Sequence, residues 1–167
     1  MTRPKAVLIG PPGSGKTTIG TALAERLGVA FRDTDADVEA TAGKPVSDIF
    51  IDDGEQRFRE LEGAAVRRAL AEHDGVLALG GGAILAPATQ ELLAGHTVVY
   101  LQVGLSDAVQ RVGLATARPL LVLNPRSRLR ELMAEREPIY KRLAAITVGT
   151  DGRDPGDIVE KIIKELS

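Results

Sequence analysis

Residues 10–18 read GPPGSGKTT, and this stretch decides what kind of fold the chain adopts. The spacing G-x-x-x-x-G-K-T is met by Gly10, Gly15, Lys16 and Thr17. A short apolar run precedes the stretch and a segment of helical period follows it, which is the context of a phosphate-binding loop between a strand and a helix. The sequence therefore predicts a loop that binds the phosphates of a nucleotide.

Each residue type in this loop contributes to phosphate binding. Glycines allow backbone N–H groups to turn inward around an anion, and the start of the following helix adds the positive end of its dipole. Lys16 supplies a cation, and the hydroxyl of Thr17 is a ligand for Mg²⁺, which we expect as the cofactor. The predicted nucleotide-binding residues of the loop are Gly13, Ser14, Gly15, Lys16, Thr17 and Thr18.

The composition limits the partners. The 167 residues include no cysteine and carry a formal net charge of -2, with acidic and basic residues interspersed. This balance predicts neither a nucleic-acid partner nor a polybasic membrane patch, and the lack of cysteine excludes a disulfide framework. No segment approaches the roughly 20 apolar residues of a membrane span, and the N-terminus lacks the pattern of a signal peptide. We expect a cytoplasmic monomer that binds small molecules.

Short apolar runs alternate with longer segments of helical period, which is typical of a parallel sheet covered on both faces. The predicted strands span residues 5–9, 30–34, 76–79, 97–102 and 145–148. The predicted helices span residues 16–27, 56–71, 88–93, 105–112, 126–143 and 155–166. The fold class is therefore α/β. Residues 113–125 show no period and contain prolines, so they form a long loop of the kind that often acts as a lid.

Two carboxylates follow the second predicted strand. Asp33 and Asp35 are two residues apart, so their side chains share a face in extended backbone, at the strand end where open α/β sheets bind ligands. One carboxylate can hold Mg²⁺ through water while the other accepts a hydroxyl proton. Taken alone, the pattern favours the alternative, an acidic turn that caps a helix, and Asp37 is assigned to that alternative.

Arginines and glycines further along the chain each have two interpretations. Arg59 has a glutamate at i−4 and another at i+3, which is typical of an exposed helix face with weak ion pairs. Arg136 is one of many charges in RSRLRELMAERE, a pattern that predicts a solvated face. Arg118 is either a solvated loop residue or a phosphate ligand. The glycines at 80–82 follow a predicted strand and indicate either a flexible turn or a place where a ligand meets the backbone.

The histidines and aromatic residues offer no further site. His73 and His96 lack metal-ligand spacing, and we expect both on the surface near turns. Tyr100 and the phenylalanines are expected in the core, because 3% aromatic residues provide no platform on which bases can stack.

The motifs, taken in order, resemble those of the shikimate kinase family over nearly the whole chain. They are GPPGSGKTT, DTD, GKPVSDIF, DGEQRFRELE, LGGGA, TARPLL, REPIY and TDGRDP. The resemblance implies a nucleoside-monophosphate-kinase-like P-loop fold, a three-layer αβα arrangement with a five-stranded parallel sheet of order 2-3-1-4-5. It also implies transfer of the γ-phosphoryl group of ATP to the 3-hydroxyl of shikimate, giving 3-phosphoshikimate and ADP in aromatic amino acid biosynthesis.

The resemblance assigns roles around the acceptor. Asp35 would bind the hydroxyls of shikimate and act as the base, while Asp33 would hold magnesium through water beside Thr17. Arg59 and Arg136 would bind the carboxylate, which agrees with the planar pair of donors that arginine offers and lysine does not. The acceptor pocket would also be lined by Gly80, Gly81 and Gly82.

The resemblance also assigns roles around ATP. Arg118 would reach the phosphates from a lid at about residues 113–125, and Arg111 and Pro155 would border the adenine. The catalytic residues would be Asp35, Lys16 and Arg118. The whole chain, residues 1–167, would be a single domain whose acceptor-binding region spans about residues 33–62.

Other functions stay open from the sequence. A gluconate kinase usually has a histidine- and proline-containing segment after the aspartate pair, whereas this chain reads ADVEATAGKPVSDIF there. An adenylate kinase needs a nucleotide acceptor pocket and generally a longer chain. A catalytically silent P-loop domain has no need to keep Lys16, Thr17, Asp33, Asp35 and Arg118.

Overall fold

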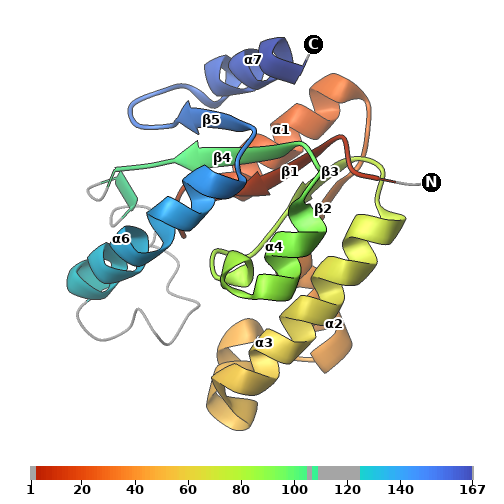
Figure 1. Ribbon diagram of the computed structural model, residues 1–167, viewed down its shortest axis with the longest axis vertical. Helices are drawn as coiled ribbons and strands as arrows, with labels where there is room; N and C mark the ends of the chain where they lie inside the picture. The colour runs from red at the N-terminus through yellow and green to blue at the C-terminus, as the bar shows by residue number, and fades with distance from the viewer. Residues whose placement is uncertain (1–2, 105–106, 109–124, 167) are drawn as a thin grey trace.

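The computed structural model describes residues 3–104, 107–108 and 125–166 of the chain (Figure 1). A parallel sheet of five strands forms its middle layer, in the order β2-β3-β1-β4-β5. The strands are β1 (Ala6–Ile9), β2 (Phe31–Asp33), β3 (Val76–Ala78), β4 (Val98–Gln102) and β5 (Ile146–Gly149). The predicted fold class and strand order are confirmed.

Helices cover both faces of the sheet. They are α1 (Lys16–Leu27), α2 (Thr34–Ala42), α3 (Val46–Glu72), the 3₁₀ helix η1 (Ala83–Leu85), α4 (Pro87–Leu93), α6 (Pro125–Leu143) and α7 (Pro155–Leu166). Of the predicted helix at 105–112, only residues 107–108 are described, and both are helical.

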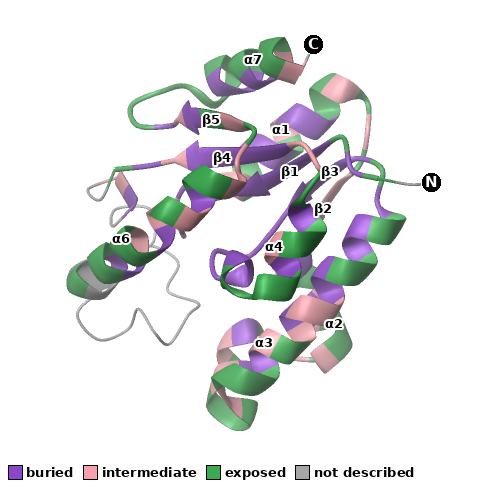
Figure 2. Cartoon of the chain, viewed as in Figure 1, coloured by how far each residue is buried: buried purple, intermediate pink, exposed green. Residues whose placement is uncertain are grey.

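The sheet is buried from both sides, as Figure 2 shows for its central strands. Along β1, Ala6 and Leu8 pack in a cluster with α1 and α7, while Val7 and Ile9 pack in a second cluster with α3, α4 and α6. Because successive strand residues point to opposite faces, a strand between two helical layers needs apolar residues at every position. This requirement explains the unbroken run AVLI.

Helices α2 and α3 form a unit with an apolar cluster of its own, which we call the acceptor unit. Val38 of α2 packs there with Ile49 and Phe58 of α3. The backbone of α3 is interrupted at Gly54, which has a φ of 88° and a ψ of 165°. In Figure 1 the beginning of α3 lies at the far end of this unit, away from the sheet.

The sequence analysis missed part of this unit. It predicted no helix at 34–42, and it placed the start of the next helix at residue 56 instead of Val46. Helix α2 buries only Thr34 and Val38, so its sequence carries almost no apolar period. The first part of α3 is separated from the rest by the Gly54 break, which hides the continuity of the helix in the sequence.

The expectation that His73 lies on the surface is wrong, because the residue is only 8% exposed. Its Nε2 lies 3.1 Å from the carbonyl oxygen of Ala30 and 3.0 Å from that of Val76. Carbonyl oxygens only accept hydrogen bonds, so Nε2 carries the hydrogen. His96 is half-buried, and burial, with the nearby charge of Arg3, lowers the pKa of His96.

His73 lies in the short connection between α3 and β3, and this connection should not tolerate a side chain at Gly75. A Cβ there would lie 2.1 Å from the carbonyl oxygen of Ala30, which belongs to the backbone and cannot rotate away. We expect Gly75→Ala to lower the free energy of unfolding in urea by about 1–3 kcal/mol, the usual cost of overpacking.

The matched control is Gly63→Ala in the middle of α3. Among the described residues, its Cβ would meet only the end of the Arg67 side chain, 3.7 Å away. Alanine is preferred to glycine in a helix, so this variant should gain up to about 1 kcal/mol. Equal unfolding free energies for the two variants would contradict this account of the connection.

Candidate active site

The phosphate-binding loop lies between β1 and α1, as the sequence predicted. Gly15 precedes the first helical residue with a φ of 91°, a conformation that glycine adopts without strain. Lys16 folds back over the loop, where its Nζ donates to the carbonyl oxygens of Gly10 at 2.8 Å and Pro11 at 3.1 Å. The ammonium group is thereby held at the N-terminus of α1, the place where a helix attracts phosphate.

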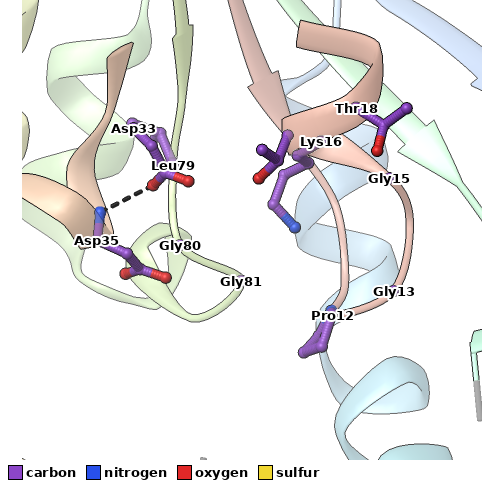
Figure 3. Close-up of a pocket in the computed structure, with 11 residues that line it drawn as sticks. Pro12, Gly13, Gly15, Lys16, Thr18, Asp33, Asp35, Leu79, Gly80 and Gly81 are labelled. Carbon is purple, nitrogen blue, oxygen red and sulfur yellow. Dashed lines mark hydrogen bonds between the residues drawn. The ribbon is translucent and has the colours of Figure 1, made fainter. Parts of the chain in front are cut away.

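A cavity of about 480 Å³ joins this loop to the predicted carboxylates (Figure 3). One wall comes from the loop and α1, and the other comes from the ends of β2 and β3. The lining residues are Pro12, Gly13, Gly15, Lys16, Thr17, Thr18, Asp33, Asp35, Leu79, Gly80 and Gly81. A cavity of this size holds a small molecule.

Asp33 serves as the cap of α2. Its Oδ1 accepts a hydrogen bond of 2.8 Å from the backbone N–H of Asp35. The capping interpretation is therefore correct for Asp33, but Asp33 also lines the cavity, so the two interpretations do not exclude each other. Thr17 lines the same cavity, and a hydroxyl with one carboxylate fits Mg²⁺, which takes few protein ligands beside water and substrate phosphates.

Asp35 and the buried Glu62 come together beside Gly80. A Cβ on Gly80 would lie 2.7 Å from Oδ1 of Asp35 and 2.9 Å from Oε2 of Glu62. Glu62 is only 3% exposed, and its Oε1 accepts from Nη1 of Arg59 at 2.8 Å. The sequence predicted the ion pair of Glu62 with Arg59 on an exposed helix face. The i+3 spacing of the two residues does not indicate that Glu62 is buried.

Two arginines approach the other glycines. A Cβ on Gly82 would lie 2.6 Å from both Nη atoms of Arg59, and a Cβ on Gly81 would lie 3.4 Å from Nη1 of Arg136. The structure therefore brings both predicted carboxylate ligands to the triglycine segment at residues 80–82.

The charge patterns predicted a solvated helix face for each arginine, which is wrong for Arg136 and correct only in its ion pairs for Arg59. Arg136 is 5% exposed, although the charges around it in the sequence are typical of a surface. The side chain of Arg59 is 25% exposed and makes the expected ion pairs with Glu55 and Glu62. Glycines without side chains allow α3 and α6 to bring these guanidinium groups against the backbone.

Tyr140 is a site residue to which the sequence analysis gave no role. Its hydroxyl donates to the carbonyl oxygen of Gly81 at 2.6 Å, and its ring stacks on Tyr100 with the centroids 5.0 Å apart. Burial, with a smaller contribution from Glu137, raises the pKa of Tyr100 to about 12, so its phenol stays neutral. The tyrosine in the motif REPIY was the available signal, and the contact shows that it supports the triglycine backbone.

A second cavity, of about 250 Å³, opens beside the phosphate-binding loop. It is lined by Ser14, Gly15, Thr18, Ile19, Thr150, Arg153, Pro155 and Ile158. Pro155 thus lines a cavity together with residues of the phosphate-binding loop. Arg111, Arg118 and the predicted lid up to residue 124 lie outside the described residues.

The model of the shikimate kinase family matches residues 12–167 of the chain. The chain belongs to the shikimate kinase family. The shikimate kinase of Salinispora arenicola is 62% identical over 164 residues, which is 98% of each chain. The shikimate kinase of Thermobifida fusca is 61% identical over 165 residues, which cover 99% of this chain and 96% of the Thermobifida fusca protein.

A solved structure of the family agrees with the fold. The shikimate kinase of Acinetobacter baumannii, in complex with shikimate, is 36% identical to this chain and superposes with a TM-score of 0.94. The match covers 99% of this chain and 93% of the other. Members of the family phosphorylate shikimate with ATP, so the chain is an ATP-using kinase, and the gluconate kinase, adenylate kinase and silent-domain alternatives fall away. In the described part of the chain, no helix is long and apolar enough to cross a membrane.

Gly80 should be required for turnover of the acceptor. A methyl group there would clash with the carboxylates of Asp35 and Glu62 and displace them. Gly80→Ala should therefore lower kcat/KM for the acceptor by about 10-fold or more. The KM for ATP should change little. Both are measured by ADP release.

Gly149→Ala on β5 is the control, because a Cβ there would have no described neighbour within 4 Å. It should keep normal kinetics. A Gly80→Ala variant that folds and matches this control would show that the space beside Gly80 is not needed.

Proposed function

We propose that this chain transfers the γ-phosphoryl group of ATP to the 3-hydroxyl of shikimate, giving 3-phosphoshikimate and ADP. The observation that carries the proposal is the position of the phosphate-binding loop opposite Asp35, in one cavity with the triglycine segment and its arginines. The likeness to the Acinetobacter baumannii enzyme in complex with shikimate supports this choice of acceptor.

The carboxylate of shikimate would be bound by Arg59 and Arg136. Both guanidinium groups lie against the triglycine segment and are largely withdrawn from water. Charge-assisted hydrogen bonds from arginine to carboxylate are strong and fix orientation, because the donors form a rigid plane. Glu62 holds Nη1 of Arg59 at 2.8 Å and thereby orients the group for its ligand.

Asp35 would position the 3-hydroxyl and accept its proton. Phosphoryl transfer requires little covalent chemistry from the protein, so the main tasks are to align the attacking oxygen and to stabilise charge on the phosphoryl oxygens. A carboxylate within hydrogen-bond distance of the hydroxyl performs the first task and takes the proton as the new bond forms. Asp35 lies on the wall opposite Lys16, and this position supports the proposed role.

The loop would perform the second task. Lys16 and the backbone of residues 13–18 would hold the β- and γ-phosphates of ATP, and Thr17, with Asp33 through water, would hold Mg²⁺. When bound, this ion neutralises charge on the phosphate oxygens. In the same proposal Arg118 contacts the phosphates from a lid at about residues 113–125, while Arg111 and Pro155 border the adenine.

The proposal includes the setting in which the chain works. It acts as a single-domain monomer in the cytoplasm, with ATP and shikimate as its partners and no nucleic acid or membrane. The near balance of charges, with a net value of -2, supports small-molecule partners.

The acceptor test compares ADP release with shikimate, its methyl ester, gluconate, AMP and no acceptor. We expect release with shikimate alone, because esterification removes the negative charge that the arginines bind. An ester that turns over as well as the acid would contradict the proposed carboxylate site, and faster release with gluconate or AMP would contradict the acceptor.

The same carboxylate site is tested from the protein by Arg136→Ala. This variant should weaken shikimate binding by about 2–4 kcal/mol, since it leaves a desolvated carboxylate underpaired, and should leave ATP binding nearly unchanged. Arg130→Ala is the control, because Arg130 is an exposed arginine on the same helix. Equal losses for ATP and shikimate would place Arg136 elsewhere.

The role of Asp35 is tested by Asp35→Asn, which keeps the shape but cannot take a proton. We expect kcat to fall by about 10²-fold or more with ATP binding intact. Asp74→Asn makes the same change of charge at an exposed position and should behave as wild type. Near-normal turnover of folded, nucleotide-bound Asp35→Asn would assign the base to another group.

A further inference from the structure

The acceptor unit joins the sheet at two neighbouring strands, β2 and β3. Helix α2 begins at Thr34, directly after the last residue of β2, so the chain passes from sheet to helix with no linker. Helix α3 ends at Glu72, and three residues separate it from the start of β3 at Val76. Because β2 and β3 are paired in parallel, with Arg32 opposite Leu77, the acceptor unit starts at the carboxyl end of β2 and ends at the amino end of the neighbouring β3.

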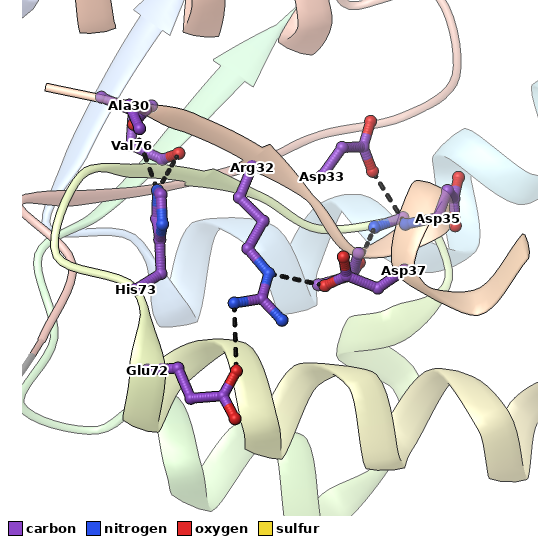
Figure 4. Close-up of polar contacts among 10 residues, drawn as sticks. Ala30, Arg32, Asp33, Asp35, Asp37, Glu72, His73 and Val76 are labelled. Atoms are coloured by element: carbon purple, nitrogen blue, oxygen red, sulfur yellow. Dashed lines mark hydrogen bonds and ion pairs between the residues drawn. The ribbon is translucent and has the colours of Figure 1, made fainter. Parts of the chain in front are cut away.

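Arg32 lies between these two junctions. Phe31, its neighbour on β2, packs toward α1, where its ring lies 2.3 Å from the position of a Cβ on Gly20. Successive strand residues point to opposite faces, so Arg32 points toward the side of α3. There its Nε donates to Oδ2 of Asp37 at 2.8 Å and its Nη1 donates to Oε2 of Glu72 at 3.3 Å (Figure 4).

The two contacts differ in strength. The side chains of Arg32 and Asp37 are 24% and 22% exposed, whereas that of Glu72 is 56% exposed. Exposed ion pairs contribute little because water screens them, so the contact to Asp37 is the stronger one. Asp37 lies in the first turn of α2.

That first turn also carries Asp35. The turn is held from the inside by two contacts: the cap from Asp33 to the N–H of Asp35, and a 3.3 Å hydrogen bond from the N–H of Gly80 to the hydroxyl of Thr34. Both lie on the side of the cavity. The bond from Arg32 to Asp37 holds the turn from the opposite side, and so limits rotation of α2 about its junction with β2.

We propose that Arg32 and Asp37 are positioning residues, which hold the first turn of α2 so that Asp35 faces the phosphate-binding loop at the distance that transfer requires. The inference rests on the proposed function, in which Asp35 acts on the acceptor hydroxyl. A displacement of about 1 Å at a reacting group is enough to cost up to about 10²-fold in rate. Sequence analysis had assigned Asp37 to a helix-capping turn, and the structure gives it a partner on the strand.

The test measures kcat and both KM values for Arg32→Met, Asp37→Asn and the double variant. We expect each single variant to lower kcat by about 5- to 20-fold with the KM for ATP unchanged. The double variant should be no slower than the slower single variant, because both substitutions break the same contact. Arg32→Lys, which keeps the charge but reaches only one partner, should recover part of the loss.

Glu72→Gln is the matched control. It removes the more exposed partner of the same guanidinium and should change kcat by about twofold or less. A merely stabilising role would instead lower the midpoint of urea unfolding and leave kcat of the folded protein unchanged, and that result would overturn the inference. Fully multiplicative losses in the double variant would overturn it as well.

A second double variant separates this inference from the proposed function. In the Asp35→Asn background, Arg32→Met should slow turnover by about twofold or less, since no base is left to misplace. If kcat is low for Asp35→Asn but normal for Arg32→Met and Asp37→Asn, only the positioning role is refuted. A normal kcat for Asp35→Asn refutes the role of Asp35 as the base, and with it the positioning role. A further 5- to 20-fold loss in the Asp35→Asn background, about the single-variant effect, shows that Arg32 acts through another group.

Discussion

The backbone at residues 80–82 has no side chains, and charged groups from three helices occupy the space beside it. Asp35 of α2, Glu62 and Arg59 of α3, and Arg136 of α6 all lie 2.6–3.4 Å from the positions that a Cβ would take there. Because the glycines leave this room, side chains that are far apart in the sequence meet around one short segment. Every polar group proposed to bind the acceptor depends on that constraint.

The strand order explains why this segment faces the nucleotide loop. The phosphate-binding loop follows β1, the triglycine segment follows β3 and Asp33 ends β2, and these three strands are neighbours in the order β2-β3-β1. Parallel strands direct their carboxyl ends to one edge of the sheet, so three segments separated in the sequence form two walls of one cavity. Catalysis therefore uses a feature of topology that no single motif contains.

The site contains buried charges of both signs. Buried carboxylates are costly unless positive groups or hydrogen-bond donors compensate them, and Glu62 meets this condition through Arg59. Arg136 is buried beside the triglycine segment, and a guanidinium group there offers a rigid pair of donors to an anionic ligand. The proposed positioning role of Arg32 extends the same logic to the outer side of α2, where an ion pair holds a helix in place.

The sequence by itself determined the fold class, all five strands to within one or two residues at their ends, and the nucleotide loop. These features depend on local patterns: apolar runs, helical period and a glycine-rich motif have the same meaning wherever they occur. The resemblance carried by the ordered motifs also indicated the family before any geometry was known.

Only the tertiary structure decided which charged residues are buried. Arg136 and Glu62 have the local surroundings of surface residues, and His73 lies beside a turn, yet all three are buried by elements distant in the sequence. Helix α2 was missed for the same reason, because it is stabilised by its cap and by packing on α3 and not by a period of its own. Burial is a property of the neighbours that a residue acquires on folding, and the sequence around the residue does not contain them.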